Sequence, residues 1–335
     1  MALGVLIMGR KRSGNEWLPT RVYAGKSAYE YRPKAGGCIR LAPLSAKAET
    51  VIRRYDEEKL KLELLTGSFH QLCKEFLCSG EFYKLATGTQ KDYQRCSLIP
   101  IEVFGKVDSK SIKPEHIRKF MDKRGKRSET RANREHSFMS KVFSWSYERG
   151  KVTLNPCLKV RKFTETPRKR YIKDDEYNAM YTCARDQLKA AMEISYCCAS
   201  RQGDILSLSR SDILEEGLYV KQGKTQKIQI KKWTPRLKAA IKLAIDAQPV
   251  SHVERIFVSK GGHKITTDMI GHWWKRAKAE AKLKYPSITF DFTFHDIKAK
   301  SISDYEGNKQ TFSGHKTASQ VAVYDRKPEI VDSHN

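Results

Sequence analysis

The stretch Ser200-Arg201-Gln202-Gly203-Asp204-Ile205-Leu206 follows an apolar run through Ala191, Ile194 and Tyr196, and it adds an arginine and an aspartate to that run. The apolar spacing predicts a helix that leads up to a turn carrying Arg201. An arginine in this place is, by itself, an ordinary charge at the end of a helix. Its interpretation therefore depends on the polar groups that follow it within residues 195–326.

A lysine lies in a predicted hairpin downstream of this helix. Leu218-Tyr219-Val220 and Ile228-Gln229-Ile230 are short runs of strand-forming residues, and the turn between them contains Gly223-Lys224-Thr225. A lysine in a polar turn is usually a solvated charge, and Lys227 competes with Lys224 for any chemical role.

Two histidine segments and a tyrosine complete the set. His295-Asp296-Ile297-Lys298 follows two phenylalanines, and Ser313-Gly314-His315-Lys316 contains the glycine of a tight turn. Tyr324 lies nine residues after His315, among valines. Each residue alone is consistent with a core histidine, a turn or ordinary packing. Their order and spacing on one basic chain indicate a site.

Common signatures of nucleotide and metal chemistry are absent from the sequence. It contains no GxxxxGK[ST] loop, no GxGxxG after a strand, no HExxH and no convincing carboxylate cluster for Mg²⁺. Chemistry on a phosphate would therefore use cationic side chains and hydrogen-bond donors, and we expect no cofactor and no bound metal.

In order and spacing, these residues resemble the catalytic motifs of the tyrosine recombinases of the phage-integrase type. The resemblance covers an arginine on a helical turn, a lysine turn, an HxxR motif, a Leu-Gly-His turn and a nucleophilic tyrosine. It implies six catalytic residues: Arg201, Lys224, His295, Lys298, His315 and Tyr324.

The chemistry of a phosphodiester suggests a role for each of them. Fixed cations lower the barrier by stabilising the charge on the phosphate oxygens, and we assign this role to Arg201, Lys298 and His315. Tyr324 would attack phosphorus and leave a 3′-phosphotyrosine and a free 5′-hydroxyl, as in the family. His295 would act as base or positioning group, and Lys224 would protonate the departing oxygen.

One residue departs from the family pattern. Lys298 stands where the family has its second arginine. Lysine keeps the positive charge but lacks the planar fork that binds a phosphate through two hydrogen bonds. Lys300 is a second candidate for the same task.

The charge of the chain indicates a polyanionic partner. Lys and Arg total 64 against 38 Asp and Glu, which gives a formal net charge of +26 over 335 residues. Double-stranded DNA is the leading candidate. A membrane partner is not expected, because no stretch approaches the roughly 20 apolar residues that span a bilayer.

The N-terminus and the cysteines indicate a cytoplasmic protein, and the resemblance implies a bacterial host cell and association with its nucleoid. The N-terminal apolar run is short and its charges follow it, unlike those of a secretory signal. The eight cysteines are scattered and form no zinc-type pattern, so we expect reduced thiols.

Changes in residue pattern along the chain predict a multidomain α+β protein. Residues 1–60 suggest a small three-stranded sheet followed by a helix with Ala48, Ile52 and Tyr55 near one face, and by resemblance an arm-type DNA-binding domain. Residues 64–158 suggest an all-helical core-binding domain, residues 159–170 a flexible basic linker, and residues 171–335 the mainly helical catalytic domain. Within that domain, Thr234-Pro235 and Asp268 are predicted helix starts.

Basic residues outside the catalytic set are candidates for phosphate contact. They fall in the N-terminal tail, in the basic segment of the helical domain and in the linker. The set is Arg10, Lys11, Arg12, Lys123, Arg124, Lys126, Arg127, Arg131, Arg134, Arg168, Lys169 and Arg170.

The resemblance implies site-specific DNA recombination that integrates or excises a prophage or genomic island. Four protomers would assemble on arm-type and core-type attachment sites, with a DNA-bending host factor and an excisionase as further partners. They would exchange strands through a Holliday junction and swap C-terminal segments.

Two alternatives remain open. The first is a type IB topoisomerase-like enzyme that relaxes DNA as a monomer. The second is a DNA-binding relative that is catalytically weakened by Lys298. Within the favoured class, a resolvase that separates DNA dimers is also consistent with the sequence.

Overall fold

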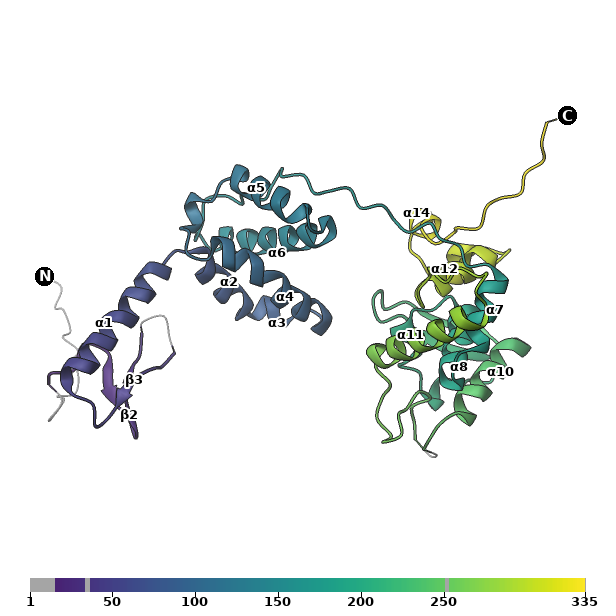
Figure 1. Cartoon of the computed structure of the whole chain (residues 1–335), viewed down its shortest axis with the longest axis horizontal. Helices are drawn as coiled ribbons and strands as arrows, with labels where there is room; N and C mark the ends of the chain where they lie inside the picture. The colour runs from purple at the N-terminus through teal and green to yellow at the C-terminus, as the bar shows by residue number, and fades with distance from the viewer. Residues whose placement is uncertain (1–15, 34–36, 251–252, 335) are drawn as a thin grey trace, which may run out of the picture. The chain divides into compact units, whose positions relative to one another are not determined.

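The computed structural model describes residues 16–33, 37–250 and 253–334. The chain forms two compact units, residues 1–165 and residues 166–335 (Figure 1). The first carries a small sheet and a group of helices, and the second carries the site. The basic tail with Arg10, Lys11 and Arg12 lies outside the described residues.

The N-terminal sheet agrees with the sequence prediction. Strands β1 (Val22–Ala24), β2 (Ala28–Tyr31) and β3 (Ile39–Pro43) pair antiparallel in the order β1-β2-β3. Figure 1 shows α1 (Ala48–Leu65) beside this sheet. The helix runs past residue 60, where we predicted the domain to end.

The predicted inner face of α1 was wrong at Ala48 and Ile52 and correct at Tyr55. Val51 is fully buried in the small core with Val22 and Leu41, whereas Ile52 is 39% exposed and Ala48 is exposed. Tyr55, which was predicted to lie near this face, packs edge-on against Tyr31 at 5.0 Å between ring centroids.

The rest of the first unit is helical, as predicted. Its elements are α2 (Phe69–Leu77), α3 (Gly80–Tyr83), α4 (Thr87–Phe104), the 3₁₀ turn η1 (Ser109–Ser111), α5 (Pro114–Gly125) and α6 (Glu129–Tyr147). Phe76 lies at the centre, where its ring meets those of Phe82, Phe138 and Trp145. Pro114 occupies the first turn of α5, where its missing N–H costs no hydrogen bond.

The second unit is mainly helical with one hairpin. Its elements are α7 (Asp174–Thr182), α8 (Asp186–Cys198), α9 (Gln202–Ile205), η2 (Arg210–Asp212), β4 (Gly217–Lys221), β5 (Ile228–Lys232), α10 (Pro235–Asp246), α11 (Thr267–Lys284), α12 (Asp296–Asp304), α13 (Lys309–Ser313) and α14 (Ala318–Ala322). Helix α8 packs against α10 and α12. The hairpin and the Thr234 cap of α10 agree with prediction, but α11 is capped by Thr266 and not by Asp268.

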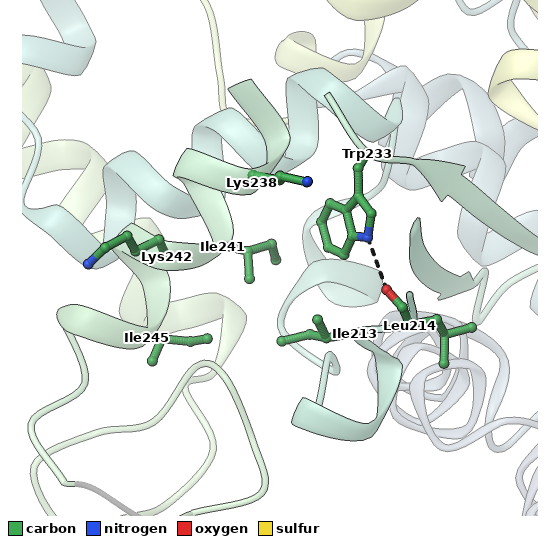
Figure 2. Close-up of a pocket in the computed structure, with 7 residues that line it drawn as sticks. All are labelled: Ile213, Leu214, Trp233, Lys238, Ile241, Lys242 and Ile245. Carbon is green, nitrogen blue, oxygen red and sulfur yellow. Dashed lines mark hydrogen bonds between the residues drawn. The ribbon is translucent and has the colours of Figure 1, made fainter. Parts of the chain in front are cut away.

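An apolar hollow separates the base of the hairpin from α10 (Figure 2). The indole N–H of Trp233 donates to the carbonyl of Leu214 at 3.0 Å, which ties the end of β5 to the segment before β4. Ile213 and Ile241 line the hollow with the stems of Lys238 and Lys242. None of the six predicted catalytic residues lines it.

Residues 159–170, which were predicted to form a flexible linker, are held by hydrogen bonds at both ends. Asn133 holds Phe163 through two hydrogen bonds of 2.9 Å and donates to Glu165 at 2.8 Å, all within the first unit. In the second unit, Arg168 donates to the backbone carbonyl of Asp291 at 2.7 Å. Only residues 166 and 167 lie between these two sets of bonds.

Among the described helices, none is both long and apolar enough to cross a membrane. The described residues also contain no group of three or more His, Cys, Asp or Glu side chains arranged to hold a metal ion.

Candidate active site

The structure brings five of the six predicted catalytic residues together: His295, Lys298 and His315 lie around the ring of Tyr324, and Arg201 lies near Lys298 and His315. Arg201 follows α8, His295 and Lys298 lie at the start of α12, and His315 follows α13. Lys224 is exposed in the hairpin turn and makes no side-chain hydrogen bond or ion pair within the described residues. Its competitor Lys227 is exposed in the same turn.

Tyr324 is half-buried and follows Val323, the residue that caps the C-terminus of α14. The ring of His315 stacks on it at 4.9 Å and 25°, and the ring of His295 meets it edge-on at 5.9 Å. Its carbonyl accepts a 3.1 Å hydrogen bond from Ser303, and its ring packs against a small apolar cluster that includes Ile302. The backbone and the ring are therefore fixed, while the hydroxyl makes no hydrogen bond within the described residues.

Lys298 is buried without a hydrogen-bond partner in the part of the chain that the structure describes. The residue is 1% exposed, and its Nζ lies 5.6 Å from the centre of the Tyr324 ring. Burial, together with the nearby charges of Arg201 and Lys231, lowers the pKa of Lys298 to about 7. A buried, unpaired amine costs free energy unless something outside the chain completes its hydrogen bonds.

His315 corrects our assignment of a fixed cation. Burial and the charges of Lys298 and Arg201 lower the pKa of His315 to about 4, so the imidazole is neutral at physiological pH. Its Nδ1 lies 2.7 Å from the Ser313 hydroxyl, and its Nε2 has no hydrogen-bond partner among the described residues. When the hydroxyl donates to Nδ1, the ring proton resides on Nε2, and His315 acts as a neutral donor.

His295 remains suited to accept a proton. Partial removal of the ring from water lowers its pKa, Asp296 opposes this effect, and Lys298 and Arg201 add to it. Below that lowered pKa the imidazole is protonated, and above it the ring nitrogen is free to act as a base.

Asp296 joins the start of α12 to the segment after Tyr324. Its carboxylate accepts from Arg326 at 2.7 Å and from the backbone N–H and hydroxyl of Thr293 at 2.9 Å each. Burial raises its pKa, but the hydrogen bonds from Thr293 and Arg326 outweigh this, and the net shift is downward.

Lys300 does not serve as the alternative to Lys298. Its ammonium group pairs with Asp174 at 2.6 Å and with Asp304 at 3.0 Å. Burial opposes its charge, but the hydrogen bonds to the two carboxylates outweigh this and raise its pKa. The two lysines are two residues apart on one helix and have opposite environments.

Three polar residues of the site were not singled out from the sequence. Asp204 accepts from the backbone N–H of Gly223 at 2.9 Å, Gln222 lies between Arg201 and α13, and the ammonium group of Lys231 donates to the carbonyl of Phe312. Burial lowers the pKa of Lys231 to about 8. The three-residue spacing of Asp204 from Arg201 was a usable signal, whereas nothing in the sequence showed that Lys231 points inward.

The predicted DNA contacts divide into exposed and engaged residues. Lys123, Lys126, Arg127, Arg134 and Lys169 are exposed. Arg131 and Arg134 lie 3.9 Å and 4.0 Å from Asp92, the first of them half-buried.

Three of the predicted DNA contacts are occupied by carboxylates or backbone of the chain itself. Arg124 forms two hydrogen bonds of 2.7 Å and 2.6 Å with buried Glu135. Arg168 binds the Asp291 carbonyl, and Arg170 pairs with Glu176 and Asp291.

Comparison with known proteins agrees with this geometry. Residues 170–329 match the model of the phage integrase family. The integrases of Enterobacteria phage 434 and Escherichia phage lambda are each 26% identical over 200 residues, which is 56% of this chain and 56% of theirs. The match thus spans about half the length of these curated relatives.

Solved structures extend the similarity along the chain. A crystal structure of a lambda integrase dimer bound to a COC′ core site has a TM-score of 0.66 at 19% identity, and the match covers 97% of this chain and 99% of that one. A lambda integrase tetramer bound to a Holliday junction has a TM-score of 0.65 at 19% identity, covering 94% and 99%. The fold is therefore shared along most of the chain.

Proposed function

Because residues 170–329 match the model of the phage integrase family, we propose that this chain is a site-specific DNA recombinase that cuts and rejoins DNA through Tyr324. The observation that carries the proposal is the arrangement around that residue. A half-buried tyrosine lies among His295, His315 and the amine of Lys298, and within the described residues neither its hydroxyl nor that amine has a hydrogen-bond partner.

The reaction is a transfer of the phosphodiester to tyrosine. The Tyr324 oxygen forms a bond to phosphorus, the bond from phosphorus to the 5′-oxygen breaks, and the tyrosine proton passes to His295 or to water. The departing 5′-oxygen takes a proton from Lys224, which lies in an exposed turn that can meet DNA. The phosphotyrosine retains the energy of the phosphodiester, so rejoining requires no ATP.

The unpartnered donors of the site would stabilise the transition state. Arg201 supplies a permanent charge, and neutral His315 supplies its Nε2–H. A bound phosphate favours the protonated form of Lys298, because an anion close to an amine raises its pKa. This assigns the buried amine to the place of the family's second arginine.

The proposals on DNA sites, assembly and accessory proteins rest on resemblance to the relatives. We propose that residues 1–60 bind arm-type sites and that the helical and catalytic domains grip the core site. Four protomers would assemble on two DNA partners and integrate or excise a mobile element. A DNA-bending host factor and an excisionase would assist, by resemblance to lambda-type integrases.

Covalent capture tests the proposal. Source-organism DNA is fragmented, lightly nicked and incubated with the full chain in EDTA. Protein–DNA adducts that survive denaturation are collected, and their DNA is sequenced. The most enriched fragment is then rebuilt as a synthetic nicked duplex. We expect an adduct with wild type and none with Tyr324→Phe.

The other outcomes separate the alternatives. DNA binding without an adduct in either protein would contradict the proposal and favour a weakened DNA-binding relative. An adduct gained only by Lys298→Arg would identify that residue as the cause. Relaxation of supercoiled plasmids without sequence preference would instead favour a topoisomerase-like enzyme.

A further inference from the structure

Gln222 is a buried amide at the junction of three segments of the site. The residue is 4% exposed and directly follows β4. Its Oε1 accepts from Arg201 at 3.2 Å and from the Thr225 hydroxyl at 2.9 Å. Its Nε2 donates to the carbonyl of Ser313 at 2.9 Å. One side chain thus contacts the arginine, the lysine turn and the residue two positions before His315.

The backbone of Gln222 also closes the turn that carries Lys224. Its N–H donates to Lys227 O at 2.8 Å, and its carbonyl accepts from Gln226 N at 2.8 Å. A displacement of Gln222 therefore displaces the whole turn.

The hairpin holds the end of α13 through three successive carbonyls. Carbonyls in the last turn of a helix lack partners inside the helix. Here Gln229 donates to Thr311 O at 2.6 Å, Lys231 donates to Phe312 O, and Gln222 donates to Ser313 O. Among these three hairpin side chains, Gln222 is the one that also contacts Arg201.

Gly314 permits this close contact. Its φ is +69°, and a Cβ on it would lie 2.7 Å from Gln222 Nε2. The amide therefore occupies space that any other residue at position 314 would fill. The backbone that leads into His315 packs directly against Gln222.

We propose that Gln222 is a positioning residue that sets Arg201, the Lys224 turn and His315 in register for strand cleavage. An amide suits this position because it accepts two hydrogen bonds through oxygen and donates one through nitrogen. This inference rests on the proposed function. Misplacement of reacting groups by about 1 Å slows a reaction by roughly 100-fold.

The test compares Gln222→Met with Gln229→Met. Both variants remove a hydrogen bond between the hairpin and α13, but only the first also removes contacts to Arg201 and Thr225. Single-turnover adduct formation is measured on the captured synthetic duplex, together with DNA affinity and thermal unfolding. We expect Gln222→Met to be slower by roughly 100-fold and Gln229→Met by no more than about threefold, with unchanged DNA affinity.

A substrate with sulfur in place of the bridging 5′-oxygen shows how much of the rate loss in Gln222→Met arises from the general acid, Lys224. A thiolate leaves without a general acid because its pKa is low. The defect of Gln222→Met should shrink to about tenfold on this substrate, since only the Arg201 and His315 contributions remain. A purely structural role would leave the defect equal on both substrates.

Two outcomes would overturn the inference. In the first, wild type forms adducts, and Gln222→Met forms them as fast as Gln229→Met does. The other is an equal defect on the oxygen and sulfur substrates. If Gln222→Met does not fold, Gln222→Glu replaces it: it keeps the acceptor for Arg201, loses the donor to Ser313, and should show an intermediate rate. Absence of any adduct with wild type would instead reject the proposed function.

Discussion

At Lys298 the chain buries an amine that has no hydrogen-bond partner among the described residues. Its pKa of about 7 lies below the ordinary 10.5, so between these values the unfolded chain binds more protons than the folded one. Stability from this group therefore rises as pH increases from about 7 to 10.5. The cost at lower pH is consistent with a residue retained for chemistry.

Lys298→Met should stabilise the protein and abolish cleavage. Removing a buried, unpaired ammonium group should raise the free energy of unfolding by about 1 kcal/mol at pH 6, with a smaller gain at pH 9. Urea unfolding at both pH values measures this. Lys300→Met is the matched control and should destabilise the protein, because it leaves Asp174 and Asp304 without their lysine. A destabilised Lys298→Met would contradict the argument.

Lys298→Arg should change the pH profile of cleavage. The wild-type amine loses its proton as pH rises through about 7, so adduct formation at limiting DNA should decline above that pH. A guanidinium stays charged throughout this range, so the variant should keep its rate to about pH 9. Initial rates across pH 6–9 measure the difference. Superimposable profiles would show that Lys298 is not the titrating group.

At the scale of elements, the pair of Asp296 and Arg326 ties α12 to the segment after α14. Their side chains are 2% and 7% exposed and lie 2.7 Å apart. Asp296→Asn should destabilise the protein by about 3 kcal/mol, because Arg326 would remain charged, buried and uncompensated. Asp246→Asn, in the exposed pair with Lys242, should change stability by less than about 0.5 kcal/mol.

The contribution of Asp296 to stability should depend on pH in a defined direction. The pKa of Asp296 is below its ordinary 3.8 in the folded chain. Its contribution is therefore fully present above about pH 4 and is lost as pH falls through the lowered value. Thermal unfolding of wild type and Asp296→Asn should thus converge in acid. A constant difference down to pH 2 would contradict the assignment.

Local signals in the sequence predicted most of the elements. The hairpin, the N-terminal sheet and the Thr234 and Pro114 helix starts were recognisable from short-range rules. Where packing overrides pattern, the same rules failed. In β5, Lys231 is buried while Ile228 and Ile230 are 50% and 44% exposed, which reverses the usual alternation.

The site itself was predicted as a set of residues, but without its electrostatics. Order and spacing selected Arg201, His315 and Tyr324, which the fold brings together. Those patterns contain no information on burial, and burial is what makes His315 neutral and Lys298 weakly basic. Gln222 has no local signal at all, because its role arises from contacts with segments distant in sequence.

At the scale of the whole molecule, the net charge of +26 predicts salt-dependent DNA binding. Arg127→Gln should weaken binding and lower the slope of log affinity against log salt by about 1, while stability is unchanged. Arg124→Gln should instead lower stability by about 3 kcal/mol, because it breaks a pair with buried Glu135. Filter binding at several salt concentrations, with urea unfolding, separates the two. Identical effects of both variants would contradict the division into exposed and engaged arginines.

The short free span of the linker has a kinetic consequence. Between Glu165, held by Asn133, and Arg168, held by Asp291, the chain extends by no more than about 11 Å. Under the proposed function, in which both units bind one duplex, binding of one unit would hold the other near its site at an effective concentration of about millimolar order. A unit that releases its half of the site is therefore recaptured intramolecularly before it diffuses away. Under the proposed function, two DNA-binding units joined in this way would form one complex whose residence time exceeds that of either unit alone.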